Sequence, residues 1–260
     1  MDIQFVSCAW EEIRGFVASR LRERRALADS YWEDHVLGAN HYKMLCGEEL
    51  AGCFAIHGKE TLVLFDVLPA YAHLAQALFA RAKAYETVTR AMVVTDDGLF
   101  VSLCMDQFDR LEKQAYFAAY TGRKPREDAA RVSLSPVTIQ EDREAFGKCG
   151  DFFSKEELER LEKGVDHMRI YLARRDGVAV GLGVLEYGRV LTENASIGMC
   201  VYQEFRRQGL ATAILRALQE IACEEGLTPV SGCWYYNHNS KKSQEAAGAY
   251  CPVRLVHFCF

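Results

Sequence analysis

The sequence lacks the features that mark metal-binding, secreted and membrane-spanning proteins. Its ten cysteines include no C-x-x-C pair, and none pairs with a histidine at zinc-finger spacing. No stretch approaches the ~20 apolar residues of a membrane span. The N-terminal "MDIQFVSCAWEEIRGF" is acidic early and has no long apolar run, unlike a secretory signal. We therefore expect no metal ion, no membrane association, and reduced, mostly buried thiols in a cytoplasmic protein.

The chain also lacks a strong net charge. At −5 over 260 residues it is mildly acidic, which gives no global footprint for DNA or RNA, so any anion site must be built locally. Half of the residues are hydrophobic, as in ordinary globular proteins with a core. The length suits one large domain or two of ordinary size.

One segment changes composition clearly. "YTGRKPREDAARVS", residues 120–133, contains a glycine, a proline and mixed charges, with almost nothing to bury. Such segments run over the surface and often separate domains. We therefore predict a first domain over residues 1–125 and a second over residues 132–260.

The second half has a clear pattern of elements. Residues 140–164 are helical, with a capping box that starts at Ser154. Two β-branched strands meet at an Asp176-Gly177 turn, and "NASIGMCV" is a third strand. A long amphipathic helix follows from about Gln208 to Glu225. After Gly226 come the strand "PVSGCWYY", the short helix "NSKKSQEAAGAY" and the final strand "VRLVHFCF".

The first half repeats this order. A helix within residues 10–28 precedes three strands, "HYKMLCGEE", "LAGCFAIHG" and "ETLVLFDV". An amphipathic helix over residues 71–85, a strand at 89–95, a short helix at 97–105 and a strand at 110–120 follow. Helix, three strands, helix, strand, helix, strand occurs twice, which indicates two structural repeats.

The stretch "YQEFRRQGLATAIL", residues 202–215, joins a strand to the start of the long helix. The first N–H groups of a helix have no intrahelical acceptor and lie at its positive dipole end, which suits phosphate oxygens. Gly209 permits close approach and unusual φ values, while Arg206 and Arg207 add positive charge at the rim. This pattern is typical of a pyrophosphate site.

The same stretch carries a family resemblance. It resembles the acyl-CoA-binding motif R/Q-x-x-G-x-G/A of the GNAT superfamily of N-acyltransferases, with Arg206, Gly209 and Ala211 at the defining positions. "NHNSKKSQEAAGAY" resembles a later motif of the family, with Asn237, Ser240 and Gly248 at matching spacing. The resemblance covers residues 132–260 and implies a mixed α/β fold of the α+β type. We expect tandem GNAT-like domains, each a central mixed sheet flanked by helices.

The resemblance implies how acetyl-CoA, the acyl donor, would bind. The strand before the helix should splay from its neighbour, so that the backbone of Met199, Cys200 and Val201 contacts the pantetheine arm. The amides from Arg207 to Thr212 should hold the pyrophosphate. The residues expected to bind the donor are therefore Met199, Cys200, Val201, Arg206, Arg207, Gln208, Gly209, Leu210, Ala211, Thr212, Asn237 and Ser240.

Direct acyl transfer requires a group that takes the amine proton. Members of this family often use a glutamate on the central strand. Glu193 is the nearest candidate and Glu186, on the preceding strand, is the second.

The sequence departs from the family at the general acid. Many members carry a tyrosine on the helix after the asparagine, where alignment on Gly248 puts Gln244 or a neighbour. Tyr250 is the first alternative, and Tyr235 or Tyr236 are others. Cys200 has apolar neighbours and no histidine placed to activate it, so we interpret it as a structural thiol.

The first half retains the strand and helix without the loop chemistry. Aligning Val67 with Val201 puts Ala72, Ala75 and Ala77 at the arginine, glycine and alanine positions. We predict a degenerate GNAT-like domain without the cofactor loop, which shapes the structure or the substrate site. The alternative is an unrelated α+β domain.

The sequence thus favours an acetyl-CoA-dependent N-acetyltransferase. Its acceptor would be a primary amine of a small molecule or an exposed amino group, reached by direct transfer without nucleic acid or membrane partners. A non-catalytic acyl-CoA-binding or sensing module is the alternative, and the protein is expected to be a monomer or a homodimer. No residues follow "VRLVHFCF" to form the family's last strand, so we expect the first domain to cover this strand by pairing or packing.

Overall fold

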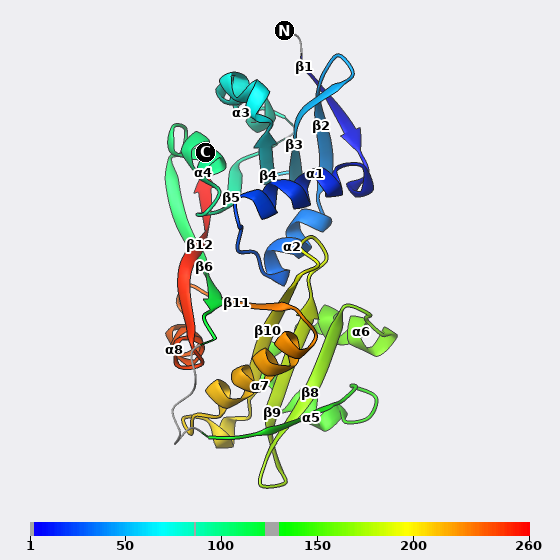
Figure 1. The fold of residues 1–260 in the computed structure, drawn as a ribbon, viewed down its shortest axis with the longest axis vertical. Coiled ribbons are helices and arrows are strands. Elements are labelled where there is room, and N and C mark those ends of the chain that lie inside the picture. The colour runs from blue at the N-terminus through cyan, green and yellow to red at the C-terminus, as the bar shows by residue number, and fades with distance from the viewer. Residues whose placement is uncertain (1–2, 86, 123–129) are drawn as a thin grey trace. The chain divides into compact units, whose positions relative to one another are not determined.

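The computed structural model describes residues 3–85, 87–122 and 130–260 (Figure 1). The chain forms two compact units. The first unit runs to Tyr116 and includes Val253–Phe260, and the second spans Phe117–Pro252. Part of the connection expected at residues 120–133, namely residues 123–129, lies outside the described residues. Each unit is described by itself below.

The first unit begins with β1 (Ile3–Cys8), α1 (Trp10–Glu23) and α2 (Ser30–Leu37), followed by an antiparallel group of strands, β2 (Asn40–Cys46), β3 (Glu49–His57) and β4 (Thr61–Val67). A 3₁₀ turn η1 (Pro69–Leu74) then leads into α3 (Ala75–Lys83), β5 (Arg90–Val94), α4 (Gly98–Met105) and β6 (Arg110–Tyr120). These elements follow the predicted order, with β1 and α2 added.

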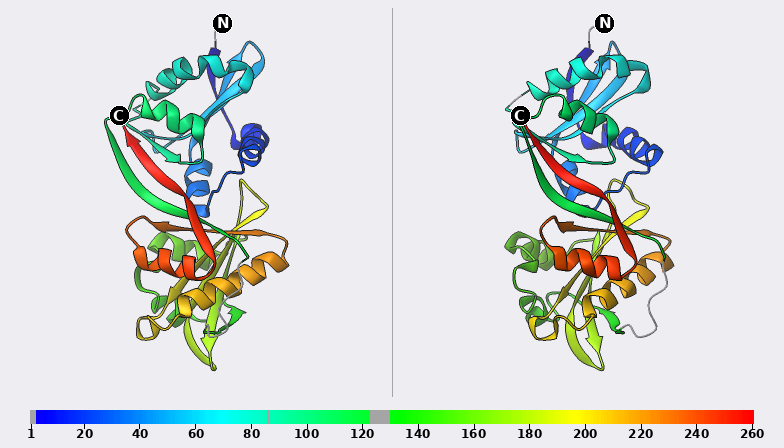
Figure 2. Two further views of the ribbon diagram at one scale, coloured as in Figure 1. Left: turned by 60° about the vertical axis from the view of Figure 1, so that its left-hand side comes forward. Right: turned by 90° about the vertical axis from the view of Figure 1, so that its left-hand side faces the viewer.

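The sheet of the first unit has the strand order β1-β2-β3-β4-β5-β12, where β12 is Ala249–Cys259. Neighbours are antiparallel except β4 and β5, which are parallel and pair only at Thr61–Arg90 and Leu62–Ala91. One face packs on α3 and α4 through a core that includes Phe65 and Phe79. Figure 2 shows α1 on the other side of this sheet.

The last strand completes the first unit. Residues Leu255–Cys259 of β12 pair antiparallel with β5, and the buried side chains Leu255, Val256 and Phe258 belong to this unit. The expectation that the first half of the chain would cover "VRLVHFCF" by strand pairing is confirmed.

The second unit contains β7 (Ser133–Pro136), α5 (Arg143–Gly147), η2 (Gly150–Phe152) and α6 (Lys155–Lys163), then β8 (Met168–Arg175), β9 (Val178–Tyr187) and β10 (Asn194–Val201). A short η3 (Gln203–Phe205) leads to α7 (Leu210–Glu224), β11 (Thr228–Trp234) and α8 (His238–Ala246). The predicted helical stretch 140–164 is divided because Gly150 has φ +59°. The predicted capping box is confirmed: Glu157 N–H donates to Ser154 Oγ at 3.1 Å.

The sheet of the second unit has the order β6-β11-β10-β9-β8-β7. The end of β6 reaches this unit, where the Tyr120 and Ser231 hydroxyls are 3.0 Å apart. Helix α7 packs on one face through Leu210, Ile214 and Leu218. Residues of α5 and α6, with Cys149 and Phe153 between these helices, pack on the other face, called the α5/α6 face below.

The same unusual backbone contact occurs within each unit. A Cβ on Gly52 of β3 would lie 2.3 Å from the carbonyl oxygen of Asp66 in β4. A Cβ on Gly181 of β9 would likewise lie 2.1 Å from the carbonyl oxygen of Cys200 in β10. Only glycine fits at either site, so Asp66 and Cys200 hold equivalent positions.

The residues that follow β4 and β10 are equivalent as well. Leu68 N–H donates to Ala51 O at 2.8 Å, and Tyr202 N–H donates to Val180 O at 3.0 Å. Leu68 has φ −59° and ψ 146°, and Tyr202 has φ −58° and ψ 146°. The alignment of Val67 with Val201 therefore agrees with the backbone geometry.

Candidate active site

The strands β10 and β11 separate soon after they meet. They pair in parallel at Asn194–Thr228, Ala195–Pro229 and Ser196–Val230, and within the described residues the pairing ends there. On its other side, β10 stays paired with β9 through Val201. The stretch 197–201 therefore has one backbone edge that faces β11 without pairing to it. Met199, Cys200 and Val201 lie in this stretch, where the resemblance placed them.

The loop between β10 and α7 has two residues in the left-handed region. Arg207 has φ +65° and Gly209, the N-cap of α7, has φ +76°. A Cβ at position 209 would meet only Ala130 Cβ at 3.9 Å, so glycine is favoured here by its φ and not by lack of space. Alternating right- and left-handed residues before a helix point successive N–H groups into one concavity, which binds anions.

The helix start adds further donors. The first helical hydrogen bond to Gly209 O comes from Ala213 N–H at 3.1 Å. The amides of Leu210, Ala211 and Thr212 therefore have no acceptor in the preceding turn and point out of the N-terminal end. The Leu210 side chain itself is buried in the core and anchors the helix, so only its backbone faces a ligand.

A positive rim surrounds this loop. Arg206, Arg207 and Arg175 are all exposed. Arg206 Nε donates to Val201 O at 3.2 Å, and Arg175 donates to Gln208 Oε1 at 3.3 Å. Each bond uses one guanidinium nitrogen and orients the group, and the remaining N–H donors suit phosphate oxygens.

The predicted polar residues of the later motif cap a helix. Asn237 Oδ1 accepts from Ser240 N–H at 3.1 Å and is the N-cap of α8. Helix α8 is tied to α7, because Thr212 Oγ1 donates to Ser243 O at 3.4 Å. Asn237 and Ser240 thus position α8 beside the start of α7.

The two candidate bases lie in different environments. Glu193 is exposed in the turn before β10, and its carbonyl accepts from Thr228 N–H at 2.8 Å. Glu186 is 7% exposed and pairs across the sheet with Ser196, the last β10 residue that still pairs with β11. His167 Nε2 and an Arg189 nitrogen lie 3.5 and 3.7 Å from Glu186 Oε1. Glu186 therefore lies next to the point where the strands separate.

The candidate acids are surface tyrosines. Tyr250 is 52% exposed at the start of β12, and Tyr236 is similarly exposed. Tyr236 packs against Tyr235 and Trp234 with ring centroids 5.2 and 5.0 Å apart. Gln244, at the aligned position of the family's tyrosine, is buried and donates to Gly232 O at 3.2 Å. The glutamine thus fixes α8 against β11.

Cys200 is buried, as expected for a structural thiol, but its neighbours are not all apolar. Its Sγ donates to Cys149 O at 3.7 Å, and the hydrogen bond from the Cys149 thiol lowers the pKa of Cys200, helped by Arg206. Burial opposes this change. All ten cysteines are free.

Sequence reasoning missed two features of this region. The Tyr202 side chain is 1% exposed, and its hydroxyl has no hydrogen-bond partner among the described residues. Gly198 and Gly232 lie in the interiors of β10 and β11. A glycine inside a strand pattern is a sequence signal for close backbone approach, and it was present at both positions.

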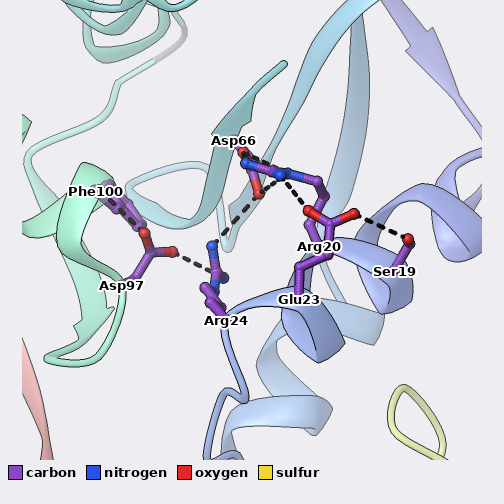
Figure 3. A network of polar contacts seen from close by, with 7 residues as sticks. All are labelled: Ser19, Arg20, Glu23, Arg24, Asp66, Asp97 and Phe100. Carbon is purple, nitrogen blue, oxygen red and sulfur yellow. Dashed lines mark hydrogen bonds and ion pairs between the residues drawn. The ribbon is translucent and has the colours of Figure 1, made fainter. Parts of the chain in front are cut away.

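The first unit holds a buried ion-pair network at the equivalent place (Figure 3). Asp66, equivalent to Cys200, is 3% exposed and contacts Arg20 Nε at 3.3 Å and Arg24 at 3.4 Å. Arg24 also contacts Asp97 at 2.9 Å. Arg24 of the first unit therefore bridges β4 to the residue that caps α4.

Asp97 corresponds to Asn237 by the same cap geometry. Asp97 accepts from Phe100 N–H at 3.1 Å, as Asn237 does from Ser240, and their φ values are both −84°. Burial raises the pKa of Asp97 to about 6, against the opposing effect of Arg24. The first unit thus has an ionic bridge where β4 and β5 diverge.

The loop after β4 also differs from its counterpart. Pro69–Leu74 forms a 3₁₀ turn that continues directly into α3, and Leu74 has φ −99°. Among the described residues of this loop, none has a positive φ. The left-handed loop conformation found before α7 therefore has no counterpart in this loop.

The described residues hold no cluster of three or more His, Cys, Asp and Glu side chains arranged for a metal ion. Within the same residues, every helix is too short or too polar to cross a membrane.

Comparisons with known proteins match both halves. Residues 9–121 match the model of an acetyltransferase (GNAT) domain, and residues 137–245 match the model of the acetyltransferase (GNAT) family. The alternative that the first half is an unrelated α+β domain is therefore wrong. No curated protein sequence matches the chain.

Solved structures show the same fold over the whole chain. An acetyltransferase from the GNAT family of Colwellia psychrerythraea has a TM-score of 0.84 at 18% identity, with 100% of both chains covered. A tandem GNAT protein from the clavulanic acid biosynthesis pathway has a TM-score of 0.63 at 16% identity, covering 99% of this chain and 98% of that one. A GCN5-related N-acetyltransferase from Sphaerobacter thermophilus scores 0.65 at 12% identity, covering 98% and 94%. With its two family matches, the chain belongs to the GNAT family of acetyltransferases and carries one domain of that family in each half.

Proposed function

We propose that the second unit transfers an acetyl group from acetyl-CoA to a primary amine, carried by a small molecule or an exposed amino group. The observation that carries this proposal is the separation of β10 from β11 directly before the left-handed loop and α7. An unpaired strand edge and an anion-binding helix start together suit a donor with an amide-containing arm and a pyrophosphate.

In this proposal the pyrophosphate lies against the amides from Arg207 to Thr212, with Arg206 and Arg207 at the rim. The pantetheine arm extends along the free edge of Met199–Val201 and exchanges hydrogen bonds with its backbone. The acetyl group then lies near the point where the strands separate. Asn237 and Ser240 contribute by holding α8 beside α7.

We assign proton removal to Glu186, with Glu193 as the second candidate. Glu186 is buried beside the separation point, whereas Glu193 is exposed in the preceding turn. The neutral amine nitrogen attacks the thioester carbonyl carbon and the C–S bond breaks. The nitrogen of the new amide releases its extra proton to water, and the CoA thiolate takes up a proton. Tyr250 or a water supplies the proton that the thiolate takes up. A water is sufficient because a thiolate of pKa near 8.5 is a fair leaving group in water.

We further propose that the first unit does not bind acyl-CoA and is degenerate in this sense. Its loop lacks the left-handed residues, and Arg24 bridges Asp66 to Asp97 across the diverging strands. Ligand binding there would require two buried carboxylates to lose their ion pair with the partly buried Arg24, which is costly.

A thiol-release assay with acetyl-CoA and a panel of amines tests the activity. Glu186→Gln should lower turnover at neutral pH by about 100-fold while acetyl-CoA affinity stays the same, because only proton acceptance is lost. Glu193→Gln tests the second candidate, and a loss of turnover in this variant alone would move the role of base to Glu193. Equal turnover of wild type and Glu186→Gln at every pH would contradict the assignment. Acetyl-CoA binding without turnover of any amine would contradict the transferase proposal.

A further inference from the structure

The second unit carries an unusual group of exposed aromatic side chains. Among the described residues, five large aromatics are more than a third exposed, and four of them lie in this unit. They are Phe152 (41%), Trp234 (61%), Tyr236 (54%) and Tyr250 (52%). Trp234 and Tyr236 contact each other edge to face. Exposed aromatic clusters of this kind mark ligand or partner sites more often than isolated ones do.

Strand geometry places Trp234 on a definite face. Val230 pairs in parallel with Ser196, so both side chains point to the same side. Ser196 and Cys200 share a side by alternation, and Cys200 packs into the α5/α6 core. Trp234, four residues beyond Val230, therefore points to the α5/α6 face as well.

The same alternation places Glu186 on this face. Glu186 pairs with Ser196 across β9 and β10 and alternates with Val184, which also packs into the α5/α6 core. A buried carboxylate and an exposed indole thus share one face of the sheet. Glu186 lies beside the separation point, and Trp234 lies at the far end of the diverging strand.

Between them the sheet has two positions without side chains. Continuing the register from Ser196 and Val230, Gly198 and Gly232 face each other across the gap on this face. Neither has a positive φ, so the backbone conformation does not require glycine. A Cβ at 198 would have only ordinary contacts, at 3.9 Å with Phe152 Cζ and Val184 Cβ. The missing side chain at position 198 therefore leaves room next to Phe152.

The first unit fills the same positions. Counting back from Asp66 and Asp97, the equivalents of Gly198 and Gly232 are Leu64 and Met92, which are 2% and 1% exposed. Both line a small cavity together with Arg24. The equivalent of Trp234 is Val94, which is buried at 7% exposure. The first unit thus has buried side chains at these three positions, whereas the second has two glycines and an exposed indole.

We propose that the acceptor of the second unit is an amine attached to an aromatic ring, and this inference rests on the proposed function. The ring lies in the space above Gly198 and Gly232, between Phe152 and the Trp234–Tyr236 pair. The amine points to Glu186, whose carboxylate complements its positive charge before proton loss. Edge-to-face and stacked ring contacts give aromatic rings an advantage over alkyl groups of similar size.

The test compares three amines with the full chain and saturating acetyl-CoA: 2-phenylethylamine, 2-cyclohexylethylamine and butylamine. We expect kcat/KM to be highest for 2-phenylethylamine, by about tenfold over butylamine. In Trp234→Ala the kcat/KM for 2-phenylethylamine should fall about tenfold, so that its preference over butylamine disappears. Tyr31→Ala, which removes an exposed aromatic of the first unit, is the matched control and should change nothing.

Binding provides a readout that does not depend on turnover. Trp234 is the one highly exposed tryptophan of the described chain, so 2-phenylethylamine should change its fluorescence in the presence of CoA, and Trp234→Phe should abolish the change. Gly198→Leu, which restores the residue of the first unit, should abolish amine binding while the melting temperature stays within a few degrees.

Three outcomes would overturn the inference. They are equal kcat/KM for the three amines, an equal loss for all three in Trp234→Ala, or unchanged amine binding in Gly198→Leu. Failure of acetyl-CoA to bind the wild-type chain would instead contradict the proposed function, so the two failures are distinguishable.

Discussion

The two units of this protein have similar backbone folds and differ in the side chains between their diverging strands. Each has a strand that must pass a glycine at close range, at Gly52 and at Gly181. Each has a parallel strand pair that diverges after two or three residues, and an acidic or amide side chain that caps the next helix. These shared features belong to the fold and carry no information about activity by themselves.

The difference lies in the space that the diverging strands create. In the first unit, Leu64, Met92 and the Arg24 bridge occupy it. In the second, the equivalent strand positions are Gly198 and Gly232, and the loop before α7 has two left-handed residues. The same pair of diverging strands can thus be filled as core or carry glycines, and we expect a ligand only in the second case. The side chains at these strand positions distinguish the two cases.

The largest expected effect concerns the strand that the second half of the sequence contributes to the first unit. Deleting residues 253–260 removes buried Val253, Leu255, Val256 and Phe258, a loss of about 6 kcal/mol or more. That is comparable with the whole stability of a domain. We expect the first unit to be unfolded, seen as rapid proteolysis within residues 3–116. A truncated chain with an unchanged melting curve would contradict this assignment of the strand.

The next effect separates the two loops. Gly209→Val places a β-branched residue at φ +76°, which it adopts only with strain, and should weaken acetyl-CoA binding about 100-fold. Ala75→Gly, at the aligned position of the first unit, should leave that affinity unchanged and cost about 1 kcal/mol of helix stability. Calorimetric titration of both variants makes the comparison. Equal sensitivity of the two loops would show that the units are functionally alike.

The ion-pair bridge of the first unit is expected to have an effect of similar size. Arg24→Met leaves Asp66 and Asp97 buried without one of their cations, which should lower the free energy of unfolding by about 3 kcal/mol. Arg14→Met, at an exposed position on the same helix, is the matched control. Urea unfolding measures both, and an Arg24 variant as stable as the control would mean that the bridge is dispensable.

The burial of Asp97 also predicts that the stability of the first unit depends on pH. Burial raises the pKa of Asp97 to about 6, above its unfolded value, so the folded state binds more protons between pH 4 and 6. The contribution of Asp97 to stability is therefore fully present below pH 4 and is lost as pH rises towards 6. Asp97→Asn keeps the helix cap and removes the titration. As pH rises from 4 to 6, the free energy of unfolding of Asp97→Asn should rise by about 2–3 kcal/mol relative to that of the wild type. A pH-independent difference in urea midpoints would contradict the raised pKa.

The smallest expected effect is at Tyr202. Its buried hydroxyl lacks a hydrogen-bond partner among the described residues, so Tyr202→Phe should leave the melting temperature the same or raise it slightly. Tyr120→Phe is the matched control, since it removes a hydroxyl bonded to Ser231 and should lower stability by about 1 kcal/mol. A clear loss of stability in Tyr202→Phe would show that the hydroxyl is bonded in solution.

Much of this architecture was accessible from the sequence. Apolar periodicity placed the long helix that starts at Leu210, and the Asp176-Gly177 turn and the Ser154 capping box fixed their neighbours, because each is a local signal. The strand β1 and the helix α2 were missed, since Ile3–Cys8 and Ser30–Leu37 have weak periodicity and depend on tertiary packing.

The candidate site divides in the same way. The loop from Arg206 to Ala211 was identified because its backbone conformation depends on local residues. The burial of Glu186, the facing of Gly198 and Gly232 and the Arg24 bridge depend on strand register and on residues far apart in the chain. No local pattern encodes them, so they required the structure.

We propose that only the second unit binds acetyl-CoA. Isothermal titration of acetyl-CoA into the full chain counts the binding sites. We expect one site per chain in the wild type, and none in Gly209→Val over the same concentration range. Two sites per chain, or one site that survives in Gly209→Val, would contradict it.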